Sequence, residues 1–203
     1  YTVNVPAPTI IVNPATLPNP TLATAYSQTT TATGGVSPYT FAVSAGSLPA
    51  GITLASGGAL AGTSNQVGTF SFTVTATDAN SQTGARAYTV TIAAPTLTLT
   101  PAAGTLTATY AVPYSQTFTA SGSPGPYNYV LTGALPAGVS FSGGVLSGTP
   151  TVPGSYPITV TATDTVLTGA GAPFSTAQNY TLDVPAPVIV IAPATLPNTT
   201  AGL

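Results

Sequence analysis

Two glycine-rich stretches of this chain, 87 residues apart, have nearly the same sequence. Gly46–Thr63 reads GSLPAGITLASGGALAGT and Gly133–Thr149 reads GALPAGVSFSGGVLSGT, with ten of seventeen positions identical once Ser56 is skipped. A second motif, TVTATD, occurs unchanged at Thr73–Asp78 and Thr159–Asp164. Because the motifs keep their order, the 203 residues contain two homologous units of about ninety residues each.

Apolar and hydroxyl side chains alternate through both units, which predicts half-buried β-strands. In the run that begins at Phe70, Phe72 and Val74 alternate with Thr73 and Thr75. Nothing in the sequence predicts a helix longer than one turn. About seven short strands per unit predict an all-β fold of two antiparallel sandwiches. Other predicted strands are Thr9–Asn13, Tyr26–Thr33, Tyr39–Ser44 and Tyr88–Ala93.

The same alternation predicts which side chains point inward. Thr73 and Thr159 are expected on the outer face, with Val74 and Val160 in the core. The predicted core of the first unit is Phe70, Phe72, Val74, Tyr88 and Val90, and that of the second is Phe118, Tyr129, Leu131, Ile158, Val160 and Leu182.

The recurring glycine-rich stretch predicts a small hairpin. Leu48–Gly51 and Leu135–Gly138 (both LPAG) read as tight turns, in which proline presets φ at the second turn residue and glycine supplies a positive φ. Ile52 and Leu54, or Val139 and Phe141, would then point inward, and Leu60 and Leu146 would return to the core. Every glycine has a backbone role here, so the stretch is interpreted as geometry rather than as a ligand loop.

The ordered motifs resemble a known family. The order is YSQT (Tyr26–Thr29, Tyr114–Thr117), SPYTF at Ser37–Phe41, LPAG, the GG-L-GT stretch and TVTATD. It is similar to the immunoglobulin-like repeats of large bacterial surface proteins, which are related to cadherin-like sandwiches. The resemblance covers both units. It implies an extracellular, cell-surface Ig-like module of the kind found in tandem arrays of adhesin-type proteins.

The chain carries almost no charge, which excludes most chemistry. Its charged side chains are Arg86, Asp78, Asp164 and Asp183, and it has no His, Cys, Met or Trp. General acid–base catalysis, nucleophilic catalysis and transition-metal binding lack their residue types, so we predict no enzyme, no catalytic residue and no cofactor. One cation cannot neutralise phosphates, so nucleic acid is excluded as a partner. The longest apolar run, Val188–Ala192, is too short to insert into a membrane.

A calcium site is the remaining metal hypothesis. Some relatives of the broader superfamily bind calcium through clustered acidic motifs, but Asp78, Asp164 and Asp183 are isolated in this sequence. Calcium prefers six to eight oxygens, several of them carboxylate. We therefore predict no metal site, with Asp78 and Asp164 capping turns through their own backbone.

The sequence near the start of the chain is repeated near its end, which indicates a second and longer repeat. Val5–Leu22 matches Val184–Ala201 at twelve of eighteen positions, with an offset of 179 residues. The predicted divisions are the last strand (Tyr1–Val5) and linker of a preceding repeat (1–7), the Ig-like domain A (8–94), the Ig-like domain B (95–184), and the linker and first strand of a following repeat (185–203). The Pro-Ala-Pro joints after Val5 and Val184 are short and semi-rigid, so the array should be a rod.

Two function classes remain. The first is a structural block of an extracellular bacterial filament or stalk that self-associates through an uncharged Thr/Ser-rich surface. Its terminal strands either continue into neighbouring repeats of one chain, which is the preferred interpretation, or exchange between subunits. Proline is the edge protection that the sequence offers, as at Pro157. The second is an adhesin module that binds carbohydrate or a host surface through aromatic platforms. For Tyr39, Tyr127 and Tyr129 the alternation instead predicts positions in the core. The candidate platforms are Tyr39, Tyr110, Tyr114, Tyr127 and Tyr129.

Glycans are possible additional partners by sequence pattern. Asn179–Thr181 and Asn198–Thr200 fit the N-glycosylation acceptor pattern, and the density of Thr and Ser permits O-glycans. Such three-residue patterns arise often by chance.

Overall fold

The computed structural model describes residue 1 and residues 6–190. In this part of the chain it contains eighteen strands and no helix. Residues 2–5 of the predicted strand Tyr1–Val5, most of the predicted strand Val188–Leu203 and the Asn198 acceptor pattern lie outside the described residues. The strands are β1 (Ile11–Asn13), β2 (Ala25–Thr29), β3 (Thr31–Thr33), β4 (Thr40–Gly46), β5 (Ile52–Leu54), β6 (Ala59–Thr63), β7 (Gln66–Thr77), β8 (Thr83–Ile92), β9 (Thr98–Thr100), β10 (Gly104–Thr107), β11 (Tyr114–Thr117), β12 (Thr119–Ser121), β13 (Tyr127–Gly133), β14 (Val139–Ser142), β15 (Val145–Gly148), β16 (Gly154–Asp164), β17 (Thr168–Gly169) and β18 (Ser175–Val184).

The chain divides into two compact units. Unit 1 comprises Tyr1–Thr98 together with Ser121–Tyr127 and Thr163–Thr176, and unit 2 comprises Leu99–Ala120, Asn128–Ala162 and Ala177–Leu203. Each unit has its own hydrophobic core, and each is described separately below.

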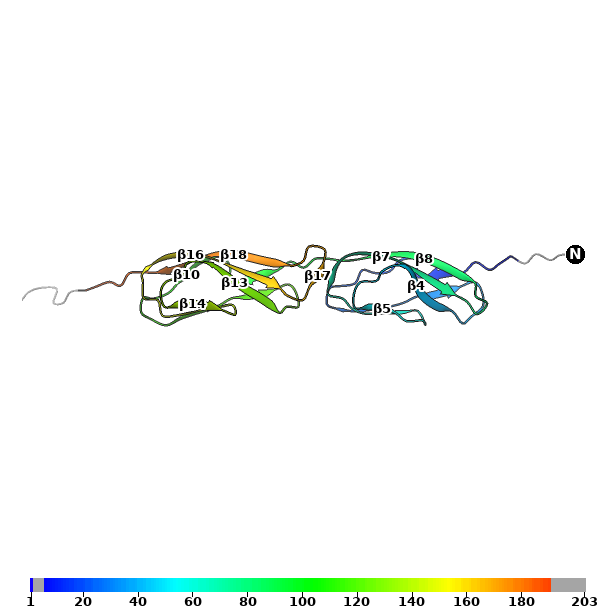
Figure 1. Ribbon diagram of the computed structural model, residues 1–203, viewed down its shortest axis with the longest axis horizontal. Coiled ribbons are helices and arrows are strands. Elements are labelled where there is room, and N and C mark those ends of the chain that lie inside the picture. The colour runs from blue at the N-terminus through cyan, green and yellow to red at the C-terminus, as the bar shows by residue number, and fades with distance from the viewer. Residues whose placement is uncertain (2–5, 191–203) are drawn as a thin grey trace, which may run out of the picture. The chain divides into compact units, whose positions relative to one another are not determined.

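Unit 1 is a sandwich of short sheets. The long strands β7 and β8 pair antiparallel, and β4 pairs with the other edge of β7. The sheet β2-β6-β5 forms the opposite layer, as the positions of β5 and of β4, β7 and β8 in Figure 1 show. The pair β1-β3 completes the sandwich, and β17 runs parallel to the start of β7. Long antiparallel strands form here because β-branched and aromatic residues alternate with hydroxyl residues.

Unit 2 repeats this plan. Its larger sheet has the order β10-β18-β16-β13, and β11-β15-β14 forms the other layer (Figure 1). The short strand β10 pairs parallel with β18, and β12 pairs with β9. Pro157 lies in β16, which has a neighbour on each side, so the expectation that this proline protects a sheet edge is wrong.

The predicted strand Tyr26–Thr33 is two strands. It breaks at Thr30, whose backbone N–H and hydroxyl both donate to the carbonyl oxygen of Gly58, at 2.7 and 2.9 Å. On one side of the break β2 pairs with β6, and on the other β3 pairs with β1. The break therefore moves the chain from one sheet to the other. Phe118 marks the same break in the second repeat, where its N–H donates to Gly144.

The predicted register and core are confirmed. Val74 and Val160 are fully buried, while Thr73 and Thr159 are half-exposed on the other face of the same strands. Of the predicted core residues, Phe70, Tyr129 and Leu131 are partly buried against their clusters, and the rest are buried. The TVTATD motif is thus a strand with valine and alanine inside and threonine outside.

The LPAG turn differs in one detail from the prediction. The Ile52 N–H donates to Pro49 O at 3.1 Å, so proline is the first residue of the turn, not the second. Gly51 is the third residue, with a φ of 86°. Proline at the first position does not set the turn; it is fully buried, so its role there is packing. The second repeat has the same turn, from Pro136 to Val139.

Candidate interaction surface

One side of the sheet β4-β7-β8 is covered by small uncharged side chains. The strands alternate between buried residues such as Val74 and Tyr88 and outward residues that are threonine, serine or alanine. A β-bulge between Val43 and Ala45 turns both Ser44 and Ala45 outward. We call this surface the hydroxyl face. It consists of Thr40, Ala42, Ser44, Ala45, Thr69, Ser71, Thr73, Thr75, Thr77, Thr83, Ala85, Ala87, Thr89 and Thr91.

The hydroxyl groups of this face bond to each other across the strands. Thr69 and Thr91 approach to 3.1 Å, Ser71 and Thr89 to 3.0 Å, and the Thr75 hydroxyl donates to Ser44 at 2.7 Å. Such cross-strand pairs hold side chains in fixed rotamers. The face therefore presents ordered methyl and hydroxyl groups without charge.

A hollow interrupts the hydroxyl face where β4 ends. It has a volume of about 340 Å³ and lies beside Gly46, with Thr73 and Thr89 on its walls. Gly46 has a φ of 72°, and a Cβ there would lie 2.1 Å from the Ser71 carbonyl oxygen. Glycine is therefore required for β4 to end against β7 at this point.

Unit 2 has a hollow at the matching place. It lies beside Gly133 at the end of β13, has a volume of about 550 Å³, and includes Thr159, Asn179 and Thr181 in its wall. The Thr159 hydroxyl donates to the Asn179 side-chain oxygen at 2.8 Å. Both hollows are lined by hydroxyl, amide and apolar groups, so they offer hydrogen bonds but no acid or base.

Asp78 joins two loops at one end of unit 1. One of its carboxylate oxygens accepts from the N–H groups of Asn80 and Gln82, at 2.9 and 2.8 Å, and the other accepts from the Val36 N–H at 2.9 Å. The bond from Val36 has the largest effect on the pKa of Asp78. Together with the two other bonds it outweighs the effect of burial, so this pKa lies below its ordinary value.

Asp164 joins two loops in the same way in the second repeat. One oxygen accepts from the N–H groups of Val166 and Leu167, both at 2.8 Å, and the other accepts from the Ser123 hydroxyl and the Gly125 N–H. Burial alone would raise the pKa of Asp164, but these four hydrogen bonds outweigh it and the pKa is lowered.

The two aspartates therefore cap turns, as their sequence pattern predicts, and each also ties down a distant loop. A carboxylate whose oxygens accept from several N–H groups offers little to a cation. Within the described residues there is no group of three or more His, Cys, Asp or Glu side chains that could hold a metal ion. Asp183 lies half-exposed on β18.

Comparison with known families agrees with this architecture. A family model described as "Putative Ig domain" matches residues 8–93 and again residues 95–185. The chain belongs to this family. Its fold is all-β, with two Ig-like sandwiches in tandem, as the sequence motifs predict.

Solved structures with similar folds are distant in sequence. The titin domains z1z2, solved in complex with telethonin, are 13% identical, with 92% of this chain and 100% of that chain covered and a TM-score of 0.49. The protocadherin GammaB4 extracellular domain is 14% identical over 88% of this chain and 35% of its own, with a TM-score of 0.39. A Bacteroides fragilis protein titled "putative alpha-galactosidase" is 19% identical over 40% of this chain and 16% of its own, with a TM-score of 0.33.

These likenesses carry no inference about partners or activity. This Ig-like chain spans a small part of the α-galactosidase and about a third of the protocadherin chain. No match was found among curated proteins. In the described part of the chain, no helix is long and apolar enough to cross a membrane.

The candidate aromatic platforms of the Ig-like repeats lie half-buried. Tyr39 packs against the core of unit 1, and Tyr110, Tyr114 and Tyr129 pack against the core of unit 2. The Tyr129 hydroxyl accepts from the Ala120 N–H at 2.9 Å. Tyr127 donates to the Ser123 carbonyl at 2.7 Å, so its ring is held against that loop. These five rings do not form a flat exposed platform.

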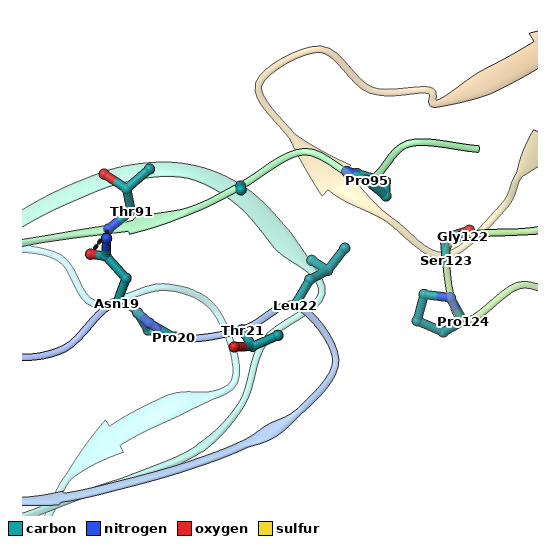
Figure 2. A pocket seen from close by; sticks show the side chains of 10 residues that line it. Asn19, Pro20, Thr21, Leu22, Thr91, Pro95, Gly122, Ser123 and Pro124 are labelled. Atoms are coloured by element: carbon teal, nitrogen blue, oxygen red, sulfur yellow. Dashed lines mark hydrogen bonds between the residues drawn. The ribbon is translucent and has the colours of Figure 1, made fainter. Parts of the chain in front are cut away.

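One pocket lies within unit 1, and sequence reasoning missed it. Its volume is about 610 Å³, and Figure 2 shows the Asn19 side-chain oxygen turned toward the Thr91 backbone, whose N–H donates to it at 2.8 Å. The pocket has no ionisable side chain, so it offers shape but no catalytic group. It is lined by Asn19, Pro20, Thr21, Leu22, Thr91, Ala93, Pro95, Gly122, Ser123 and Pro124.

Proposed function

We propose that this chain is a structural building block of an extracellular bacterial filament or surface stalk. Tandem Ig-like repeats supply the length, and copies associate laterally through the hydroxyl face. The observation that carries the proposal is that all fourteen outward residues of the sheet β4-β7-β8 are threonine, serine or alanine.

The reasoning starts from what a free sheet surface needs. Monomeric β-proteins keep apart by charged side chains, particularly lysine on exposed strands. This chain has no lysine, and its formal net charge is −2 over 203 residues. A flat surface of methyl and paired hydroxyl groups can approach a copy of itself without burying an unpaired charge. Because charge repulsion is weak and no charge would be buried, we expect copies to self-associate through this face.

The proposal includes a rod-like array of repeats. The two family matches end at residue 93 and begin at residue 95, so consecutive repeats are joined with almost no slack. A ten-residue strand such as β8 rises about 34 Å, and end loops bring each repeat to about 40 Å. Two repeats per period would give a contour repeat of roughly 80 Å, which electron microscopy of the native assembly can measure.

An adhesin that binds carbohydrate is the second candidate. The two matched hollows beside Gly46 and Gly133 offer neutral hydroxyl and amide groups, which suit a neutral sugar. The half-buried tyrosines do not support this reading, because sugar-binding modules use exposed aromatic faces for stacking. The structural role is therefore preferred.

The test is to place one charge on the hydroxyl face, at Thr73, and one at the matching outward position of unit 2, Thr159. Thr73→Lys together with Thr159→Lys adds two outward charges without touching the core, and Thr53→Lys is the control on the opposite sheet. We expect the wild-type chain to form higher-mass species in sedimentation, insensitive to salt because few charges take part. The double variant should be monomeric. A monomeric wild type, or unchanged assemblies with both lysines, would show that lateral packing through this face is wrong.

A further inference from the structure

The first strand of unit 1 lies in a slot that glycine residues make possible. The first-strand segment is residues 9–19, which contains β1. A Cβ at Gly34 would lie 2.1 Å from the Thr9 carbonyl oxygen, and a Cβ at Gly84 would lie 2.1 Å from that of Ile10. Alanine at either position would clash with backbone, so these glycines admit the segment's main chain at close range.

Side chains from two other strands hold the carbonyl groups of the segment. Arg86 donates from Nε to the Val12 carbonyl oxygen. The Tyr88 hydroxyl donates to Pro14 O at 2.7 Å, and the Tyr26 hydroxyl to Pro18 O at 2.9 Å. With Gly34 and Gly84, these three residues form what we call the first-strand slot. Arg86 is the one Lys or Arg residue of the chain, and its side chain donates to a carbonyl oxygen in this slot.

The slot also has an apolar side. Ile10, Val12 and Leu17 of the segment are 7%, 1% and 8% exposed and belong to the core of unit 1. By contrast, β1 has only three residue pairs with β3. The segment is therefore held mainly by its side chains and by the slot, and less by a long hydrogen-bonded ladder.

The sequence contains a second segment of the same pattern. Residues 189–198 (IVIAPATLPN) match residues 10–19 (IIVNPATLPN) at seven of ten positions, and two of the three differences exchange isoleucine and valine. Both prolines whose carbonyls the tyrosines bind have counterparts, Pro193 and Pro197. The counterpart of Asn19 is Asn198. Each group that the slot contacts in residues 10–19 is thus supplied again in the later segment.

The later segment begins with side chains that lie in solvent. Val188, Ile189 and Val190 are 88%, 86% and 81% exposed. Such a run of exposed β-branched residues is costly in water and favours pairing with a sheet edge. The residue aligned with Ile189 is Ile10, which is 7% exposed in the slot.

The first strand of the second repeat does not share this pattern. The equivalent stretch starting at Ile92 matches Val5–Leu22 at five of eighteen positions, against twelve for the stretch starting at Val184. In unit 2, Tyr180 still binds Pro101 O at 2.6 Å, but Gln178 occupies the position of Arg86. The later segment therefore matches the slot of unit 1.

We propose that residues 188–198 of one copy occupy the first-strand slot of unit 1 in a second copy. The inference rests on the proposed self-associating role and names its end-to-end contact. Exchange replaces residues 9–19 by nearly the same side chains, so it costs little enthalpy and is governed by concentration. Residues 9–19 have the advantage of high local concentration in their own chain, so exchange is detected best when they are weakened.

The experiment weakens one segment and then the other in the full chain carrying Thr73→Lys and Thr159→Lys, so that lateral association through the hydroxyl face does not contribute to the mass. Ile10→Asp with Val12→Asp puts charges into the core and spoils residues 9–19. We expect this variant to form linear oligomers whose mass rises with concentration. Adding Ile189→Asp and Ile191→Asp should return it to a monomer with a less stable unit 1. The two C-terminal changes alone should leave the monomer folded.

A synthetic peptide of residues 184–201 provides an independent readout, should the first variant fold poorly. It should raise the melting temperature of that variant and shorten its oligomers. The same peptide with both isoleucines changed to aspartate, and the peptide of residues 92–109, should bind at least about 100-fold more weakly. No rescue by the peptide, or oligomers that survive the C-terminal changes, would overturn the inference. If exchange fails while Thr73→Lys still disperses the wild type, the lateral proposal stands alone.

Discussion

The Asp78 carboxylate accepts a hydrogen bond at 2.9 Å from the backbone N–H of Val36, a residue 42 positions earlier in the chain. The Ala79 N–H returns a bond to Val36 O at 2.9 Å. The end of one long strand is thereby tied to the loop that precedes β4. Asp164 makes the matching connection to Ser123, at 2.6 Å. Two of the three acidic residues of the chain thus hold loops together.

Replacing Asp164, which caps a turn and ties down a distant loop, should destabilise the protein. Asp164 is 2% exposed and accepts four hydrogen bonds, so Asp164→Ala leaves buried donors without a partner. We expect a loss of about 2–4 kcal/mol in the free energy of unfolding, measured by urea denaturation. The control is Asp183→Ala at a half-exposed position, which should change stability by less than about 0.5 kcal/mol. Equal effects of the two changes would contradict the role of the Asp164 hydrogen bonds in stabilising the fold.

Stability should fall only in strong acid. The pKa values of Asp78 and Asp164 lie below the ordinary value of 3.8. A lowered pKa means that the folded state favours the carboxylate. Its stabilisation is complete above the unfolded-state pKa, about 3.9, and is lost as pH falls through the folded-state pKa.

The melting temperature should therefore be nearly constant from about pH 5 to 9 and drop below about pH 4. Burial raises the pKa of Tyr26, Tyr88, Tyr114 and Tyr180 above 10.0, so these groups stay neutral in that range. In a variant with both Asp78→Asn and Asp164→Asn, the fall in melting temperature in acid should be much smaller. If the melting temperature of this variant falls as much as that of the wild type, other groups cause the acid sensitivity.

Two glycines of the LPAG hairpin should differ sharply in their tolerance of alanine. Gly51 has a φ of 86°, and a Cβ there would lie 2.1 Å from the Thr63 carbonyl oxygen. Gly57, in the same hairpin, has nothing within 4 Å of an added Cβ. Gly51→Ala should cost more than about 2 kcal/mol, because backbone strain and a clash add together. Gly57→Ala should be near neutral in thermal denaturation; a comparable loss would contradict the backbone explanation.

Removing divalent cations should leave the protein unchanged. The oxygens of Asp78 and Asp164 are taken by N–H and hydroxyl donors, which leaves little capacity for a cation. Adding EDTA should therefore shift the melting temperature by less than one degree or so in a thermal scan. A fall of several degrees on chelation, restored by calcium, would revive the calcium hypothesis for these aspartates.

The local pattern of the sequence was sufficient for most of the strands, for their register and for the location of the hairpins. The alternation around Val74 and Val160 decides which side chains face inward, because a strand turns successive residues to opposite sides. The turn at Pro49–Ile52 depends on residues that are adjacent in sequence, since Gly51 supplies the positive φ itself. Repetition of both patterns 86 or 87 residues later fixed the number of sandwiches.

Only the tertiary structure decided the relationships between distant residues. The strand expected over Tyr26–Thr33 breaks at Thr30 because Gly58, 28 residues away, accepts both of its bonds. The sequence predicts Asp78 only as a local turn cap, yet it also accepts from Val36 in the loop before β4. Arg86 likewise donates to a carbonyl oxygen 74 positions earlier in the chain. Periodicity records which face a side chain occupies but not which strand lies beside it. Pairing is selected by the packing of the whole sandwich, because a break or a clamp is stable only when its distant partner is present.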